Sequence, residues 1–346
     1  MPQRAVYTDS MEYPKEPRKA PFPIIPFAGF ALLAAMALSL YIFGFYEATK
    51  ASFAASVVFI LVLAGFVYQV GKEGHELFKI KKYIPTLGKT NIWEFLAVLG
   101  ASIATYFISK NLGQGGVVAS SILGLAGSFV LPRFAVPLFC GSFVGMASPL
   151  AYESYTYISI AGSLAGIVFA LGKGVFDGFG GKLGTIAFLG CLGTSLLGGI
   201  QLQSSPIPSW DVGSLILIYS VSGAVLAYVL SIRFGKGPVT GSAFVGLVAG
   251  ILLPAVYGAE LGKALAVVVF CASFVGMSSA ARLGSEVLIA LAGLACGLVY
   301  IYASPWLGGA GGKLGTLAFG ATIAVGGLAR FAGLIFSPRP GARSLT

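Results

Sequence analysis

Two copies of a glycine motif that carries a lysine are the best candidates for chemistry in this sequence. GFGGKLGT occupies 178–185 and GAGGKLGT occupies 309–316. Glycines let main-chain N–H groups point into a concavity, and the N-terminus of a following helix favours anions. Lys182 and Lys313 add a positive charge to each copy, and we expect them at equivalent places on opposite faces of a membrane. The motifs predict two symmetric access sites for an anionic or strongly polar solute.

The side chains and main-chain groups expected to bind solute lie within these motifs. Thr185 and Thr316 are suited to cap the N-termini of the helices that follow. The motifs lack the spacing of a phosphate-binding P-loop. A structural alternative stays open, in which each motif is a tight turn whose lysine reaches toward the membrane interface. The predicted binding residues of the two motifs are Gly180, Gly181, Lys182, Thr185, Gly311, Gly312, Lys313 and Thr316.

A second repeated motif reads FVGMAS at 143–148 and FVGMSS at 274–279. The ends of short membrane segments that carry small and hydroxylated residues can line a pathway through their carbonyls. We therefore expect Ser148 and Ser279 to contact solute. An apolar constriction is expected from Phe143, Met146, Phe274 and Met277. The alternative is close helix packing around the glycine of each motif.

Three further features carry predictions of their own. Arg133 would lie deep in the membrane and bind an anion if the segment 115–150 enters and leaves on one side. Glu286 follows Arg282 by four residues, which predicts an ion pair on one helix face. The GxxxG pairs at 162–166 and 293–297 predict close helix packing.

Catalytic and metal chemistry has little support in the sequence. The four cysteines lie in apolar stretches without a CxxC pair, so they are expected to be packing residues. One histidine, and no nucleophile elbow or paired carboxylates, argue against an enzyme, a metal site or a cofactor. Asp177 and the few other acids near the motifs fall in predicted loops. This scarcity favours a channel, a uniporter or an anion carrier over a proton-coupled pump.

The composition determines which elements must position these residues. Of the 346 residues, 57% are hydrophobic and only 10% are charged, against roughly 25% charged in soluble chains. This excludes a soluble enzyme, a disordered chain and a nucleic-acid-binding module, in spite of the net charge of +10. An all-α polytopic membrane protein in contact with the lipid bilayer is predicted.

Apolar runs long enough to cross the bilayer predict about twelve membrane segments. If the N-terminus is cytoplasmic, 18 of the 22 basic residues fall on the inner side, as the positive-inside rule requires. Both termini are then cytoplasmic, and the plasma (inner) membrane is the expected location. The predicted segments are 24–46, 50–71, 92–109, 115–131, 134–150, 155–172, 183–203, 212–232, 238–254, 264–280, 285–303 and 314–336.

An internal duplication organises the predicted segments. The stretches 143–188 and 274–319 align without a gap, with 20 identical residues in 46 positions. Five predicted crossings separate Lys182 from Lys313, and an odd number gives the two copies opposite topology. The short segments in 115–150 and 238–280 can either cross the membrane or enter and leave it on one side. In both cases the number of crossings between the two lysines stays odd. The predicted organisation is a tail at 1–23, two helices and a basic amphipathic loop at 24–91, repeats at 92–203 and 212–336, and a tail at 337–346.

These features together predict a channel, or a facilitative or secondary transporter, for a small polar or anionic solute. Inverted repeats in transporters place the solute pathway near the bilayer midplane, between the two halves. The alternative is a non-transporting scaffold subunit of a larger membrane complex. No nucleic-acid partner is expected, and the sequence leaves homo-oligomer formation open.

Overall fold

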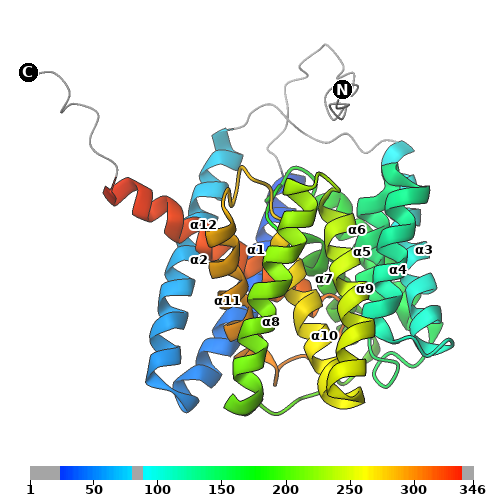
Figure 1. Cartoon of the computed structure of the whole chain (residues 1–346). Coiled ribbons are helices and arrows are strands. Elements are labelled where there is room, and N and C mark those ends of the chain that lie inside the picture. The colour runs from blue at the N-terminus through cyan, green and yellow to red at the C-terminus, as the bar shows by residue number, and fades with distance from the viewer. Residues whose placement is uncertain (1–23, 80–88, 337–346) are drawn as a thin grey trace, which may run out of the picture.

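The chain folds into a bundle of helices in a computed structural model that describes residues 24–79 and 89–336. Those residues contain twelve α-helices and no β-strand (Figure 1). The predicted tails and residues 80–88 of the predicted basic loop lie outside the described residues. The helices are α1 (Ile24–Ala51), α2 (Phe53–Lys79), α3 (Lys89–Lys110), α4 (Gly115–Val130), α5 (Ala135–Gly145), α6 (Tyr155–Leu171), α7 (Lys182–Gly198), α8 (Trp210–Tyr228), α9 (Pro238–Tyr257), α10 (Ala259–Ser273), α11 (Glu286–Ala303) and α12 (Lys313–Phe336).

Eight of these helices are long and apolar enough to cross a membrane, so the chain is an integral membrane protein by length and composition. They are α1, α2, α3, α8, α9, α10, α11 and α12. The other four are shorter: α6 and α7 have 17 residues, α4 has 16 and α5 has 11. Eleven residues rise only ~16 Å, about half of the hydrocarbon thickness. The predicted number of helices is confirmed, but not all twelve can be crossing segments.

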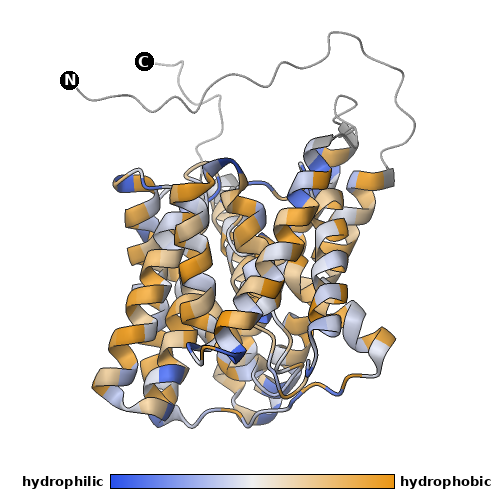
Figure 2. Ribbon diagram, turned by 90° about the vertical axis from the view of Figure 1, so that its right-hand side faces the viewer, coloured by the Kyte–Doolittle hydropathy of each residue, from blue (hydrophilic) through white to orange (hydrophobic). Residues whose placement is uncertain are grey.

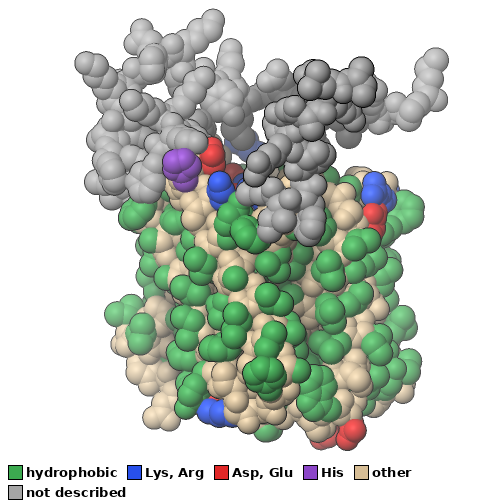
Figure 3. Space-filling view, turned by 90° about the vertical axis from the view of Figure 1, so that its left-hand side faces the viewer, with side chains coloured by type: hydrophobic (Ala, Val, Ile, Leu, Met, Phe, Trp, Pro, Cys, Tyr) green, Lys and Arg blue, Asp and Glu red, His purple; other side chains and the backbone are tan. Residues whose placement is uncertain are grey.

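The charged residues lie at the two ends of the bundle. In Figure 2 the hydrophilic residues concentrate at the upper and lower ends of the helices, and hydrophobic residues cover the length between them. The face drawn in Figure 3 shows the same belt, with Lys, Arg, Asp, Glu and His side chains at its edges. This is the pattern of a bundle surrounded by lipid, where uncompensated charge in the hydrocarbon region is costly.

Ion pairs and hydrogen bonds identify the two ends, which we name the upper and lower faces as they stand in Figure 1. The upper face holds Glu73 of α2, which binds Arg282 through both guanidinium Nη atoms at 2.5 and 3.0 Å. The lower face holds Lys110 of α3, whose Nζ donates to the carbonyl of Glu153 at 2.6 Å. The upper face is also where α2 ends and α3 begins (Figure 1).

The predicted ion pair between Arg282 and Glu286 is wrong. Arg282 lies before the first residue of α11, so the two side chains do not share a helix face. Arg282 instead binds Glu73, and Glu286 accepts a bond from Arg233 at 2.5 Å. Both bonds join segments that are distant in the chain, which no local spacing could have indicated.

Four helix ends lie inside the bundle instead of at its faces. The last seven residues of α5, from Phe139 to Gly145, are all buried, and α10 ends in a buried 3₁₀ turn, η3 (Val275–Met277). The helices α7 and α12 begin directly after the buried glycines Gly181 and Gly312, and their first residues, Lys182 and Lys313, are half-buried. These glycines have φ of +83° and +85°, a conformation that disfavours other residues. The sequence therefore starts both helices abruptly in the interior.

The starts of α7 and α12 contradict the predicted capping role of the threonines. Gly181 is the N-cap of α7 and Lys182 is its first residue, so Thr185 lies in the first turn. Its buried Oγ1 has no hydrogen-bond partner, whereas Oγ1 of Thr316 donates back to the Gly312 carbonyl at 3.4 Å. The prediction failed because the left-handed glycines begin each helix four residues earlier than a threonine N-cap would.

The cysteine and GxxxG predictions are confirmed by the packing. All four cysteines are buried and free. A Cβ added at Gly162 would lie 2.9 Å from the Ser102 hydroxyl of α3, and one added at Gly297 would lie 2.6 Å from the Ser220 hydroxyl of α8. The glycines of these motifs therefore allow α6 to approach α3 and α11 to approach α8 closely.

Candidate transport site

The two GGKLGT turns meet each other at the centre of the bundle. A Cβ added at Gly184 would lie 2.4 Å from the Cα of Gly315, and one added at Gly315 would lie 2.5 Å from the Cα of Gly184. Only residues without a side chain permit two backbones to approach so closely. The glycines of the two turns form one central contact, from which α7 and α12 run outward.

Each FVGM segment is bound to the turn of the other sequence copy. The amide of Ser148 donates to the carbonyl of Gly309 at 2.8 Å, and the amide of Ser279 donates to the carbonyl of Gly178 at 2.8 Å. The members of one bond stand 131 positions before the corresponding members of the other. The two predicted motif pairs therefore belong to one assembly, with equivalent contacts on its two sides.

The predicted glycines Gly180 and Gly311 serve this same close packing. A Cβ added at Gly180 would lie 2.1 Å from the carbonyl oxygen of Phe274, and one at Gly311 would lie 2.4 Å from that of Phe143. The amide of Gly180 donates to the Ser278 hydroxyl at 3.1 Å. The amide of this glycine is therefore bound within the protein.

Four buried phenylalanines fill the space between α5 and α10. The ring centroids of Phe143 and Phe274 are 4.7 Å apart, and both rings contact Phe139 and Phe270 at centroid distances of 4.4 to 6.3 Å. The predicted meeting of Phe143 and Phe274 is found. The sequence analysis missed the other two, although each lies one helical turn before its partner on the same helix face. We call these four residues the phenylalanine cluster.

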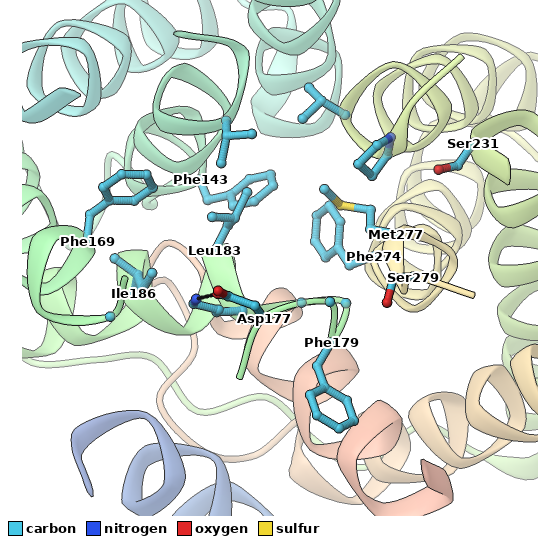
Figure 4. Close-up of a pocket in the computed structure, with 18 of the residues that line it drawn as sticks. Phe143, Phe169, Asp177, Phe179, Leu183, Ile186, Ser231, Phe274, Met277 and Ser279 are labelled. Atoms are coloured by element: carbon cyan, nitrogen blue, oxygen red, sulfur yellow. Dashed lines mark hydrogen bonds and ion pairs between the residues drawn. The ribbon is translucent and has the colours of Figure 1, made fainter. Parts of the chain in front are cut away.

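The two methionines of the predicted constriction do not join this cluster equally. Met277 lines a cavity beside Phe274 (Figure 4). Met146 instead packs against the first turn of α4, where a Cβ added at Gly116 would lie 3.3 Å from its Cβ. Of the four residues expected to form a constriction, the two that contact each other directly are therefore the phenylalanines Phe143 and Phe274.

An upper cavity of about 480 Å³ lies against the phenylalanine cluster and the first GGKLGT turn. Its walls are mostly apolar, with Phe143, Phe274, Met277, Leu183 and Ile186 facing it in Figure 4. Its polar lining comes from a small set of side chains. These are Lys173, Asp177, Lys182, Ser231 and Ser279.

The lysines of the upper cavity are both neutralised by carboxylates. Nζ of Lys182 lies 2.6 Å from Oδ1 of Asp177, the bond drawn as a dashed line in Figure 4. Lys173 forms an ion pair with Glu94 and donates to Oδ1 of Asn91 at 2.6 Å. The Lys182 side chain is only 14% exposed, whereas Asp177 is 65% exposed. The sequence analysis placed Asp177 in a loop near the motif but did not predict its bond to Lys182, because a loop assignment gives no sign that the side chain turns back toward the lysine.

A lower cavity of about 240 Å³ is lined by the second GGKLGT lysine. Nζ of Lys313 donates to the carbonyls of Ala303 at 2.9 Å, of Ser304 at 3.3 Å and of Trp306. An ammonium group has three N–H donors, so its hydrogen-bonding capacity is used. These carbonyls lie at the C-terminus of α11, where a cation is favoured by the helix dipole. Lys313 therefore has a structural role, and among the described residues no carboxylate pairs with it.

One helix connects the two cavities. Val212, at the start of α8, lines the lower cavity, and Ser231, in the π-helical turn η2 (Val229–Arg233) that continues α8, lines the upper one. A helical rise over these 19 steps amounts to about 30 Å. The cavities therefore open at opposite ends of the bundle, with the phenylalanine cluster and the glycine contact in the interior.

Arg133 and Ser148 lie outside the two cavities. Arg133 is exposed in the turn η1 (Pro132–Phe134) between α4 and α5, with its guanidinium 5.8 Å from the Phe134 ring centroid. The predicted deep anion site at Arg133 is wrong, because the buried end of this segment is the C-terminus of α5 and not the α4–α5 connection. Ser148 accepts a long bond of 3.5 Å from Nε2 of Gln203. Ser279, its counterpart, does line the upper cavity.

No group of three or more His, Cys, Asp or Glu residues that could hold a metal ion occurs in the part of the chain that the structure describes. Comparison of the chain with protein-family models, with curated proteins and with solved structures found no match in any of the three.

Proposed function

We propose that this protein is a transporter or gated channel for a small polar or anionic solute. The observation that carries the proposal is the pair of cavities at opposite ends of α8–η2, separated by the phenylalanine cluster. Each cavity is lined by the lysine of one GGKLGT motif. A scaffold subunit has no need for two such cavities, so the arrangement favours transport over that alternative.

The proposed pathway includes an inverted-topology repeat, formed by 92–203 and 212–336. Its support is the single register of the sequence duplication and the equivalent bonds formed by Ser148 and Ser279. Further support comes from the cavities, since Lys182 lines the upper and Lys313 the lower one. Broken helices that meet between two inverted halves build the solute sites of many transporters.

Passage through this pathway requires movement. The rings of the phenylalanine cluster are in contact, and the glycine backbones of α7 and α12 touch behind them. The structure thus corresponds to a closed state of the proposed pathway. A switch between two packings of the cluster would expose the cavities alternately.

We propose the upper face as the cytoplasmic one and the plasma (inner) membrane as the location. Lys173, Arg282 and Arg233 are upper-face residues, and the positive-inside rule assigns an excess of basic residues to the cytoplasm. The lower face carries Lys50 and Lys110. Both termini would then be cytoplasmic.

The proposal is tested by osmotic re-swelling of liposomes that contain the purified protein. A panel of small polar and anionic solutes is supplied outside, and the wild type should accelerate re-swelling with at least one of them over empty liposomes. Lys182→Ala should reduce that rate, because it removes the cavity's central polar group. Lys236→Ala, an exposed lysine that lines neither cavity, is the matched control. A wild type that accelerates re-swelling for none of the solutes would favour a scaffold.

The topology has an independent test with membrane-impermeant maleimide. Asp177→Cys should react from the side of the upper face, and Ser205→Cys, which lines the lower cavity at an exposed position, from the other side. The four native cysteines are buried and serve as the unreactive background. Reaction of both introduced cysteines from one side would refute the inverted arrangement.

A further inference from the structure

The two GGKLGT lysines differ in how their charge is balanced. Lys182 has a carboxylate partner, Asp177, at 2.6 Å. Lys313 is held by three main-chain carbonyls. In the duplicated register the position of Asp177 corresponds to Gly308, so only the first copy has this acid. The asymmetry makes the upper cavity chemically distinct from the lower one.

Every cation at the upper cavity has an acidic partner. Lys182 pairs with Asp177, and Lys173 pairs with Glu94. Arg282, which holds the main chain of Asp177 through an Nε bond of 2.9 Å to its carbonyl, is bound by Glu73. The charged side chains that line the cavity are Lys173, Lys182 and Asp177, and together with Glu94, the partner of Lys173, their formal charges sum to zero.

The apolar lining of the cavity strengthens the effect of this charge balance. Most of its wall is aromatic or aliphatic, which lowers the local dielectric response around a bound solute. A charged solute could then be neutralised only by a side chain that first leaves its present ion pair, for example by Lys182 leaving Asp177. A solute with both an acceptor and a donor can instead bind Lys182 and Asp177 together, since each retains unused hydrogen-bonding capacity.

We propose that Asp177 determines the charge selectivity of the upper cavity, which takes small polar or zwitterionic solutes without net charge and rejects anions. The proposal rests on the transport function proposed above and narrows its substrate class. Asp177 achieves this by neutralising Lys182, and the Ser279 hydroxyl, which lies beside Gly178, offers a further polar contact.

The test measures the flux of urea, glycine and formate into liposomes containing the full chain. These probes are of similar size and are neutral, zwitterionic and anionic. The wild type should pass urea or glycine faster than formate. Asp177→Asn leaves Lys182 uncompensated in an apolar cavity and should raise the formate-to-urea flux ratio about tenfold or more. Glu153→Gln removes an acid from an exposed lower-face loop that lines neither cavity, and it should leave the ratio unchanged.

A double variant makes the inference falsifiable without relying on a loss of function. Asp177→Asn combined with Lys182→Gln restores a cavity without net charge, so the flux ratio should return toward the wild-type value. A wild type that passes formate as fast as urea, or an Asp177→Asn variant with an unchanged ratio, would overturn the selectivity role while transport stands. If neither the wild type nor Asp177→Asn passes any probe, the transport function itself is contradicted.

Discussion

The contact between Gly184 and Gly315 gives the sharpest prediction for the packing of the bundle. A methyl group added at Gly184 would lie 2.4 Å from the Cα of Gly315, whereas ordinary contacts begin near 3.4 Å. The backbones of α7 and α12 must therefore separate by about 1 Å to admit Gly184→Ala. Overpacking of this kind costs roughly 1–3 kcal/mol, and here backbone atoms, not flexible side chains, must move.

The assay is thermal unfolding of the purified protein in detergent. The fraction that remains folded after heating is measured by size-exclusion chromatography. Gly184→Ala and Gly315→Ala should each lower the melting temperature clearly. Gly100→Ala is the matched control, because nothing lies within 4 Å of a Cβ at that helical position. There the change should be neutral or stabilising, since alanine favours a helix over glycine by up to about 1 kcal/mol.

The double variant tests whether the two glycines act on each other. Once one methyl group has separated the helices, the second enters a gap that is already widened. The combined loss of stability should therefore be smaller than the sum, with a coupling of about 0.5 kcal/mol or more. Additive effects, or a Gly184→Ala variant as stable as Gly100→Ala, would refute the central contact.

Three further predictions concern the phenylalanine cluster, the ion pair between Glu73 and Arg282, and the hydrogen bonds of Lys313. Phe143→Ala opens the phenylalanine cluster and should lower the free energy of unfolding by roughly 3–5 kcal/mol. It should also cause a solute leak that is measurable by liposome re-swelling. A stable variant without a leak would place the barrier elsewhere. Arg282→Ala leaves Glu73 without its bidentate partner and should lower the melting temperature more than Arg233→Ala. The Arg233 ion pair is largely exposed and worth at most about 1 kcal/mol. Equal effects would contradict a structural role of the half-buried Glu73–Arg282 pair. Lys313→Met removes three hydrogen bonds from the end of α11 and should destabilise the protein, whereas Lys313→Arg should restore part of the loss; unchanged melting of Lys313→Met would show that the capping is dispensable.

The positions of the motif residues in the fold agree only in part with what their spacing predicts. Lys182 and Lys313 do line separate cavities, but the glycines beside them meet in the interior. Thr185 lies inside the first turn of α7 instead of capping it. The spacing of residues indicates a turn followed by a helix, but it does not reveal the left-handed glycine at which the helix begins.

The sequence by itself determined the membrane character, the twelve helices and the two motif pairs. Hydropathy and periodicity are local properties, and a duplicated motif is visible without any knowledge of its neighbours. Only the tertiary structure decided that the motifs form one central assembly, that Phe139 and Phe270 complete the cluster, and that Asp177 neutralises Lys182. These relations depend on chain reversals and on packing between distant segments. The balance of charge at the upper cavity, on which the proposed selectivity depends, therefore arises in folding and cannot be counted along the chain.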